Sequence, residues 1–448
     1  MRNKASFLVA TTMLFGLLAG CAGSDAQSPA ETPSAGSGTE TNTNTDAGKS
    51  EPSAPAEKVT VEFWHALGGG NGDFLNAMIQ RFNESQDEVE VVGTFQGNYD
   101  ETVTKLQQAV SAGTAPEIGM VERAYVQLFA DSGVLEDLTP YLESSGMSEN
   151  DFSAGMMGHS KFDGQLLSLP LNRSTPIMHV NKSMLDEKGL AVPTTWEELK
   201  TVANALVVKE NGEITRYGVT MPYDTWYPLA MITQAKGTFF NEDNTSIGFY
   251  DNGVGKKVFS FLKDLQSTGA LYYPPAQDSG SIANQMFVEG KVGMLYQSTG
   301  AIGGLQSTVT FDYVTAFLPG DEVHANPTGG ANVVMMGDGK NKEAAWKFLH
   351  WVMTDPAGAQ QFIIDTGYLP FTKKMTESQQ MQDLWAKEPN RKVAYDQLEY
   401  AIDTNKDVAW PEVMHEFFSA IEAIMYDNQD IQATLDTFKK EADRILAQ

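Results

Sequence analysis

Cysteine is almost absent from this sequence. Cys21 is the only one among 448 residues, so no disulfide bond can form within the chain. Basic residues are also scarce, because 31 Lys and Arg stand against 58 Asp and Glu and give a formal net charge of -27. A chain this acidic is a poor partner for nucleic acids and for anionic membrane surfaces.

Complete motifs of common enzyme and metal sites are also missing. The six histidines are scattered, and no Gly-x-Ser-x-Gly string marks a nucleophilic serine. The glycines at 68–70 are not followed by the Gly-Lys-Ser/Thr of a phosphate loop, and Ser419 stands where a zinc protease starting at His415 needs its second histidine. The acidic stretch at 403–407 has Val408 in place of the glycine of a calcium loop. We therefore predict no catalytic residue, no metal site and no cofactor.

The first 21 residues have the pattern of an export signal. Arg2 and Lys4 precede an apolar run from Phe7 to Leu18, which is shorter than the ~20 residues that a membrane-spanning helix needs. This run predicts a lipoprotein signal peptide over residues 1–20. The small residues that end at Cys21 resemble a lipobox, which predicts that this cysteine is acylated. The alternative is an ordinary signal peptide that happens to contain a cysteine.

The segment that follows lacks large apolar and aromatic side chains altogether. Residues 22–57 are Ala, Gly, Ser, Thr, Pro, Asn, Gln, Asp, Glu and one Lys. Such a segment cannot bury enough surface to offset its ordering entropy, so residues 21–57 are predicted to be an acylated cysteine and a disordered tether. The protein is then expected to be extracytoplasmic and held at the outer face of the cell membrane by its lipid anchor only.

The remaining chain, residues 58–448, has the composition of a folded domain and exceeds the ~250–300 residues of a single core. Strand-like runs at 58–65, 89–95 and 117–121 alternate with helical patterns at 74–82 and 100–112. The alternation of strands and helices begins again with strands at 177–181 and 217–221, which flank a helix that starts after Thr195. The end of the chain, from Pro411, has the pattern of two helices. This pattern predicts an α/β fold with largely parallel sheets and two lobes.

Five short strings carry a resemblance to a known family. They occur in order at 63–65 (Phe-Trp-His), 97–99 (Gly-Asn-Tyr), 172–176 (Asn, then Ser-Thr-Pro), 329–331 (Gly-Gly-Ala) and 366–370 (Thr-Gly-Tyr-Leu-Pro). Together they resemble family 1 extracellular solute-binding proteins of ABC importers, and among these the members that bind glycerol-3-phosphate. The likeness runs from about residue 58 to the C-terminus.

The resemblance implies a two-lobed, periplasmic-binding-protein-like fold with a central cleft and several hinge crossovers, which closes on its ligand. One lobe is expected to comprise 58–173 plus 315–351, and the other 174–314 plus 352–448. The partners it implies are a small polar solute, an ABC permease and its ATPase, with the receptor itself a monomer.

The same resemblance implies a set of ligand contacts. The direct matches are Tyr99, Ser174, Ser298, Gly330 and Tyr368, whose hydroxyls, ring faces and backbone amide suit a polyol or a phosphate. Two matches are less direct: Glu122 fits the family's glutamate only if one residue is skipped, since an ungapped alignment puts Arg123 there, and Trp226 needs a small insertion. The alternatives are core aromatic residues for the tyrosines and plain turn residues for Ser298 and Gly330.

Two departures from the family bear on the ligand. The family's phosphate-binding arginine falls on Met414, and a thioether cannot bind phosphate. Arg173, however, stands where the family has a serine, and we predict that it could bring a positive charge to the same cleft; the alternative is a surface arginine on the hinge.

These observations predict a receptor rather than an enzyme, with glycerol-3-phosphate, a glycerophosphodiester or a related polar solute as ligand. The alternative within the same fold is a receptor for a sugar or an oligosaccharide. Alternatives of another class are a surface-anchored glycan hydrolase and a surface adhesin.

Overall fold

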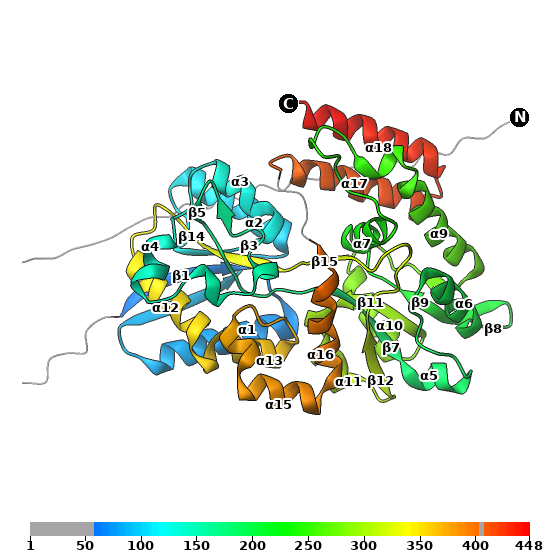
Figure 1. Ribbon diagram of the computed structural model, residues 1–448, viewed down its shortest axis with the longest axis horizontal. Coiled ribbons are helices and arrows are strands. Elements are labelled where there is room, and N and C mark those ends of the chain that lie inside the picture. Colours follow the sequence, from blue (N-terminus) through cyan, green and yellow to red (C-terminus); the bar gives the residue numbers. More distant parts are fainter. Residues whose placement is uncertain (1–57, 403–406) are drawn as a thin grey trace, which may run out of the picture. The chain divides into compact units, whose positions relative to one another are not determined.

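Two β-sheets organise the part of the chain that the computed structural model describes, residues 58–402 and 407–448 (Figure 1). The signal peptide, Cys21 and tether expected over residues 1–57, and all but the last residue of the acidic stretch 403–407, lie outside the described residues. The first sheet has the strand order β2-β1-β3-β14-β6. Its strands are β1 (Val59–His65), β2 (Val89–Phe95), β3 (Ile118–Glu122), β6 (Leu169–Pro170) and β14 (Ala331–Met335). β1 runs parallel to β2 and β3, whereas β14 runs antiparallel to β3 and β6.

The second sheet has the order β10-β9-β11-β7-β12, with β8 paired to β9 outside this path. Its strands are β7 (Pro176–Asn181), β8 (Val208–Glu210), β9 (Glu213–Thr220), β10 (Leu271–Tyr272), β11 (Val292–Ser298) and β12 (Tyr313–Ala316). β9 is parallel to β10 and β11, and β7 is antiparallel to β11 and β12. Every residue of β7 and of β14 is buried, as expected for strands that are covered on both faces.

Each sheet has a hydrophobic core of its own. Around the first sheet lie α1 (Gly69–Ser85), α12 (Lys342–Thr354), α13 (Gln361–Thr366), α14 (Lys373–Glu377), α15 (Gln379–Lys387) and α16 (Pro389–Asp396). Phe362, Met381 and Ala394 belong to this first core, together with residues of β1 and β3. The expected boundary at residue 352 therefore does not match these contacts. The sequence resemblance assigns the whole of 352–448 to the lobe of the second sheet, but the apolar faces of α13 to α16 pack on the first core.

The second core gathers α6 (Trp196–Leu206), α7 (Trp226–Gln234), α9 (Val254–Thr268), α17 (Trp410–Met425) and α18 (Ile431–Leu446). The two helices expected after Pro411 are α17 and α18, which lie side by side at the end of the chain (Figure 1). β12 pairs with β7 of the second sheet. The expected boundary at residue 315 falls inside β12. Since the whole strand belongs to the second sheet, this boundary does not match the structure either.

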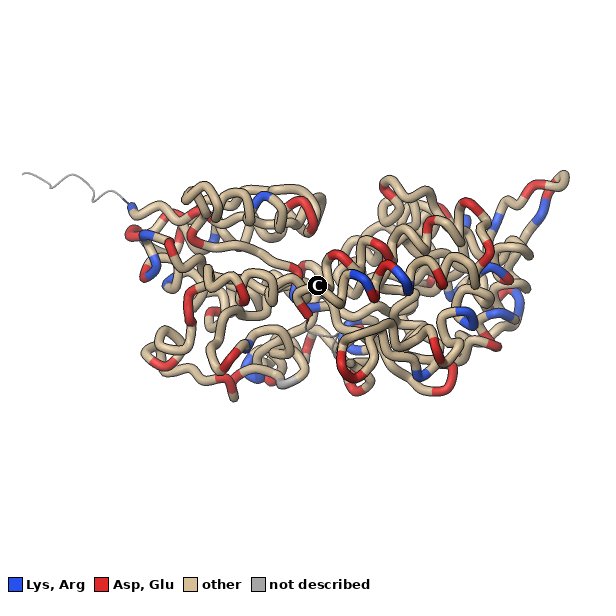
Figure 2. The backbone as a smooth tube through the Cα atoms, turned by 90° about the horizontal axis from the view of Figure 1, so that it is seen from above, with Lys and Arg blue, Asp and Glu red and all other residues tan. Residues whose placement is uncertain are grey.

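Shorter elements complete the described chain. They are α2 (Tyr99–Ala112), α3 (Val126–Asp131), α4 (Thr139–Ser144), β4 (Lys161–Phe162), β5 (Gln165–Leu166), α5 (Lys182–Glu187), α8 (Gly248–Asp251), α10 (Ser279–Val288), α11 (Ile302–Thr308), β13 (Asn326–Pro327) and β15 (Ala401–Ile402), with short 3-10 turns and one π turn at 356–360. None of the helices in the described residues is long and apolar enough to cross a membrane. In the part of the chain that the structure describes, Asp and Glu are spread over both sides of the molecule and do not form one block (Figure 2).

Three chain segments meet where the two sheets adjoin. The segment before β7, the segment after β12 and the turn at 397–400 are joined by the buried Gln397 side chain. Its Nε2 donates to Thr175 Oγ1 at 3.3 Å and to the Pro176 carbonyl at 2.7 Å, and its Oε1 accepts from the Leu318 amide at 2.7 Å. One amide side chain thus ties together three segments that connect the two sheets.

Candidate functional site

A cavity of about 510 Å³ is lined by residues from the first-sheet side and from the second-sheet side. This volume is in the ordinary range of small-ligand sites, about 300–1,000 Å³. Seven of the eight ligand contacts expected from the sequence line it: Tyr99, Glu122, Ser174, Trp226, Ser298, Gly330 and Tyr368. Residues that are separated by up to about 270 positions in the sequence are therefore brought to one cavity.

Tyr99 owes its position to the start of α2. The Asn98 side chain accepts from the Glu101 amide, and the Glu101 carboxylate accepts from the Asn98 amide, which is a complete capping box. Gly97 has φ +108, and a Cβ there would lie 1.9 Å from Glu101 Oε2. Glycine at 97 is required by this cap, and the cap sets Tyr99 as the first helical residue. The Tyr99 hydroxyl accepts from Asn172 Nδ2 at 2.7 Å.

Ser174 and Gly330 come from two backbones in direct contact. Ser174 and Gly329 exchange both amide hydrogen bonds, at 3.1 and 2.8 Å. Gly330 has φ +87, and a Cβ on it would lie 2.0 Å from the Asn172 carbonyl oxygen. This close approach explains the glycine, and it makes the wall of the cavity here out of main chain.

Trp226 opens α7 opposite these glycines. Its amide donates to the Asp224 carboxylate at 2.9 Å, and its indole Nε1 donates to the Pro327 carbonyl at 3.2 Å. A Cβ on Gly329 would lie 2.6 Å from Trp226 Cζ2, so the ring lies flush against this backbone. Trp226 is half-buried, which leaves part of its ring for a ligand.

Ser298 and Tyr368 lie at the junction of the two sheets. The Ser298 hydroxyl accepts from the Gly300 amide at 3.2 Å, so this residue shapes a turn as well as lining the cavity. Asn71 Nδ2 donates to the Tyr368 hydroxyl at 3.2 Å and approaches the Gly300 carbonyl at 3.4 Å. Tyr368 is 8 % exposed, belongs to the first core and also lines the cavity.

One face of α17 forms a further part of the wall. Trp410, Met414 and Phe418 are four residues apart, lie on the same side of the helix and line the cavity. Met414 is 5 % exposed. Position 414, to which the sequence resemblance assigns the family's phosphate-binding arginine, is therefore a methionine that lines the cavity.

Three carboxylates line the cavity. Burial raises the pKa of Asp224 to about 6, and the charge of Asp100 adds to this shift. Burial also raises the pKa of Glu122, although the neighbouring Arg123 opposes the change. Asp100 accepts from the Tyr125 hydroxyl at 2.7 Å. The residues Asp100, Asp224 and Tyr125 were not expected from the sequence, because its many carboxylates gave no reason to select these.

The Arg173 side chain does not line this cavity. Its side chain has no exposed surface, and its guanidinium donates to Asn332 Oδ1 at 3.3 Å and to Thr328 Oγ1 at 3.1 Å. The prediction that it supplies a cation to a ligand is therefore not met, because it is held behind the wall by neighbouring polar groups. Burial raises the pKa of Tyr99 and of Glu122, and the Arg173 charge, which acts from behind the wall, partly opposes both rises.

Arg123 is the one basic residue among the described residues that line the cavity. It is 2 % exposed, its Nε donates to the Thr328 carbonyl at 2.9 Å, and its guanidinium contacts His159 Nδ1 at 3.2 Å. Glu122 lies 4.0 Å from its Nε. The charges that surround the cavity are thus three acids and one engaged arginine.

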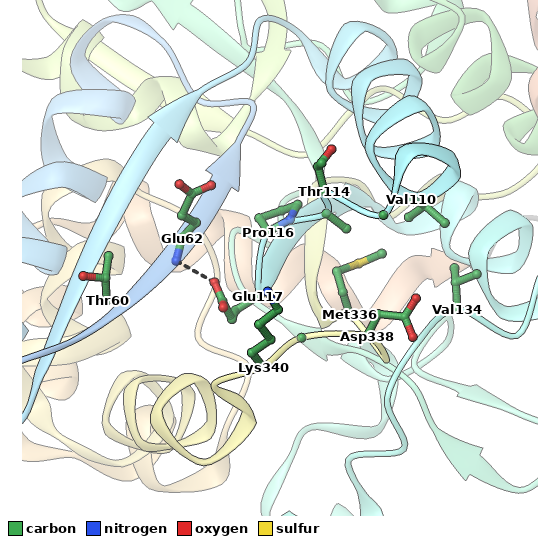
Figure 3. Close-up of a pocket in the computed structure, with 13 residues that line it drawn as sticks. Thr60, Glu62, Val110, Thr114, Pro116, Glu117, Val134, Met336, Asp338 and Lys340 are labelled. Carbon is green, nitrogen blue, oxygen red and sulfur yellow. Dashed lines mark hydrogen bonds between the residues drawn. The ribbon is translucent and has the colours of Figure 1, made fainter.

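A second cavity of about 430 Å³ lies on the first-sheet side alone (Figure 3). Thr60 and Glu62 of β1 line it together with Glu117, which precedes β3, and the Glu62 amide donates to the Glu117 carboxylate at 3.0 Å. These residues lie at the amino ends of β1 and β3, whereas the larger cavity is lined by residues that follow their carboxyl ends, where ligands bind in open α/β sheets. None of the expected contacts lines the second cavity.

Within the described ranges, no three His, Cys, Asp or Glu side chains gather as a metal site would require. The arrangement of two α/β halves, each with its own sheet and core, around one polar cavity defines a ligand-binding receptor.

The chain belongs to the family of bacterial extracellular solute-binding proteins, whose model matches residues 77–390, or 314 of the 448 residues. The resemblance inferred from the sequence is therefore confirmed. The protein is a solute-binding receptor of an ABC importer: it takes up a small polar solute outside the cytoplasm and serves a membrane permease and its ATPase.

Curated relatives carry the same resemblance at low identity. The chain is 26% identical over 419 residues to the sn-glycerol-3-phosphate-binding periplasmic protein UgpB of Agrobacterium fabrum, covering 87% of this chain and 92% of that protein. It is 26% identical over 362 residues to UgpB of Escherichia coli K12, covering 76% and 80%.

Solved structures confirm the fold class. UgpB from Mycobacterium tuberculosis, in complex with glycerophosphocholine, matches with a TM-score of 0.77 at 23% identity over 87% of this chain and 98% of that one. The Listeria monocytogenes substrate-binding protein Lmo0181, in complex with cycloalternan, matches with a TM-score of 0.78 at 21% identity over 87% and 99%. The two-lobed α/β fold expected from the sequence is the fold of these receptors.

Proposed function

We propose that this receptor binds a neutral saccharide in the cavity between its two sheets. The observation that carries the proposal is the set of charges around the cavity: Asp100, Glu122 and Asp224 are acids, and the one basic lining residue, Arg123, is already bonded to the Thr328 carbonyl. An anionic phosphate ester would meet more acidic than basic side chains in the lining, which disfavours its binding.

The other lining groups suit sugar hydroxyls and sugar ring faces. Carboxylates accept hydrogen bonds from hydroxyl groups without requiring a charge on the ligand. Trp226 and Trp410 offer aromatic surface. Gln297 also lines the cavity, with its amide held by Asn284, Ser298 and Tyr227. A polar ligand with many hydroxyls and no charge satisfies these groups best.

Met414 supports the same conclusion. It stands at the cavity where the glycerol-3-phosphate-binding members have an arginine, so the bidentate contact to phosphate is lost. Arg173 does not replace that contact, since it is buried behind the wall.

A zwitterionic glycerophosphodiester is the second candidate. The observation in its favour is that carboxylates and tryptophans lie together at the cavity, because a quaternary ammonium group binds to aromatic faces near negative charge. Its phosphate would still lack the cation that position 414 supplies in the family. We therefore rank it below a neutral saccharide.

We also propose that the two halves are lobes that close on the ligand about the segments joined by Gln397. In this assignment the first lobe is 58–170 with the segment from β14 to α16, and the second lobe is 176–316 with α17 and α18. The receptor is proposed to act as a monomer, anchored to the outer face of the cell membrane by lipid on Cys21. Replacement of Cys21 by serine should release it from membranes in cell fractionation.

Thermal melting of the purified protein tests the ligand. Monosaccharides, oligosaccharides, glycerol-3-phosphate and glycerophosphocholine would each be added in excess, since a ligand at 100 times its Kd stabilises the folded state by about 2.7 kcal/mol. Stabilisation by saccharides alone is expected. Stabilisation by the phosphate esters alone would contradict the proposal, and turnover of a saccharide would identify a hydrolase instead.

A further inference from the structure

Four aromatic side chains extend the wall of the cavity over the second lobe. Phe418 lines the cavity, and its ring lies 5.4 Å from that of Tyr223. The Tyr223 ring is in turn 5.5 Å from Tyr426 and 6.5 Å from Tyr273. We call these four residues the outer aromatic cluster. It begins at the cavity with Phe418 and continues away from it, because Tyr223, Tyr273 and Tyr426 are not lining residues.

The cluster is not simply part of the core. Tyr223, Phe418 and Tyr426 are half-buried, so each ring keeps exposed surface. The Tyr223 hydroxyl donates to the Phe418 carbonyl at 2.9 Å, and the Tyr426 hydroxyl donates to the Pro274 carbonyl. These bonds fix the rings in place. A platform of fixed rings loses little conformational entropy when a ligand packs on it.

Polar groups accompany the rings. Glu422 is exposed on α17, one turn before Tyr426, and its charge contributes after burial to raising the pKa of Tyr223 to about 12. Tyr273 is buried and supports the other rings from the core side. Ring faces beside an exposed carboxylate are a combination that suits a sugar unit, which has apolar faces and a rim of hydroxyls.

We propose that the outer aromatic cluster is a subsite for further units of an oligosaccharide whose first units occupy the cavity. This inference rests on the proposed function and adds the length of the ligand to it. Continuity from Phe418 at the cavity to Tyr426 outside it is what assigns the cluster to the same ligand.

Calorimetric titration of the purified full-length protein with oligomers of one to five units tests the inference. The probes are α-1,4-linked glucose, β-1,4-linked glucose and β-1,4-linked xylose. For the series that binds, the longer oligomers are expected to bind at least 10-fold more tightly than the shortest. Tyr426→Ala should remove this gain and leave the affinity for the shortest binding oligomer unchanged, because Tyr426 does not line the cavity.

Two control variants separate a subsite from a structural role. Tyr426→Phe keeps the ring and should keep the gain with length. Tyr250→Ala removes a half-buried tyrosine outside the cluster, which donates to Asp436, and should also keep it. An equal loss of affinity for every length in Tyr426→Ala would indicate a structural role and overturn the inference.

The remaining outcomes distinguish the inference from the proposed function. Equal affinity for all lengths in the wild-type protein overturns the subsite and leaves the saccharide receptor intact. If no oligomer of any length binds while a phosphate ester does, both are overturned. If Tyr426→Ala binds every length as the wild type does but no longer supports uptake in cells, the cluster is a docking surface for the permease and not a subsite.

Discussion

Replacing Gly330 with alanine is expected to destabilise the fold and to weaken ligand binding. Gly330 has φ +87, and an added Cβ would lie 2.0 Å from the Asn172 oxygen, 2.9 Å from its carbonyl carbon and 3.1 Å from Arg173 Cα. All three atoms belong to main chain, so no side-chain rotation can make room. The two hydrogen bonds between Ser174 and Gly329 hold the same backbones together.

The cost has two parts. The left-handed backbone conformation costs a residue with a Cβ about 1–2 kcal/mol. Forcing a methyl group into a packed site costs about 1–3 kcal/mol more. The sum is about 2–5 kcal/mol, which is a large fraction of the stability of a typical domain. The distance between the backbones at 172–174 and 329–330 also shapes the wall of the cavity at Ser174. Ligand affinity should therefore fall when the added methyl group forces these backbones apart.

Gly133→Ala is the matched control. Gly133 has φ +65, but a Cβ there would meet nothing within 4 Å, so only the conformational cost of about 1–2 kcal/mol applies. Denaturant unfolding of both variants and titration with the ligand measure the difference. Equal losses of stability in the two variants, or wild-type affinity in Gly330→Ala, would show that the methyl group at position 330 does not collide with the neighbouring main chain.

Three further substitutions have expected outcomes. Asp224→Asn should stabilise the protein by about 1–2 kcal/mol at pH 7.5 and hardly at pH 4. The reason is that folding raises the pKa of Asp224 from 3.8 to about 6, so the stability that the protonated group contributes below pH 3.8 is lost as the pH rises through 6. An equal effect at both pH values in unfolding experiments would contradict this. Gln397→Leu should lower the free energy of unfolding by about 2–4 kcal/mol, because it leaves the buried Leu318 amide and Thr175 hydroxyl without this partner. A denaturation midpoint equal to that of the wild type would show that Gln397 does not hold the three segments together. Met414→Arg should gain affinity for glycerol-3-phosphate and lose affinity for saccharides in calorimetry, provided that its melting confirms a folded protein; unchanged ligand preference would remove position 414 from the site.

Several elements could be predicted from local patterns in the sequence. The helix expected at 100–112 is α2 (Tyr99–Ala112), and the strand expected at 177–181 is β7 (Pro176–Asn181), because capping residues and apolar runs act over a few residues. The Gly97-Asn98-Tyr99 string could be read directly, since the glycine, the cap and the helix start are one local device.

The packing partners of the helices could not be predicted in the same way. α13 to α16 have apolar faces that would suit either core, and only the tertiary structure places Phe362 and Met381 against the first. The direction of the Arg173 side chain depends on Asn332 and Thr328, which are more than 150 residues away.

The acidic residues that line the cavity could not be selected from the sequence for a related reason. Asp100 and Asp224 belong to a chain with 58 acidic residues, and their common feature is the cavity that they reach from different halves of the molecule. A hint was present in the string from Tyr223 to Trp226, where an acid stands between two aromatic residues just before a helix.

Saccharide binding in the cavity can be measured by calorimetric titration of the wild-type protein and of Trp226→Ala with the saccharide that stabilises the protein most and with glycerol-3-phosphate. We expect the wild type to bind the saccharide and not the phosphate ester, and Trp226→Ala to bind the saccharide at least 10-fold more weakly, a loss of about 1.4 kcal/mol. Binding of glycerol-3-phosphate with an affinity that falls as salt is added, together with no binding of any saccharide, would show that the receptor recognises a phosphate ester instead.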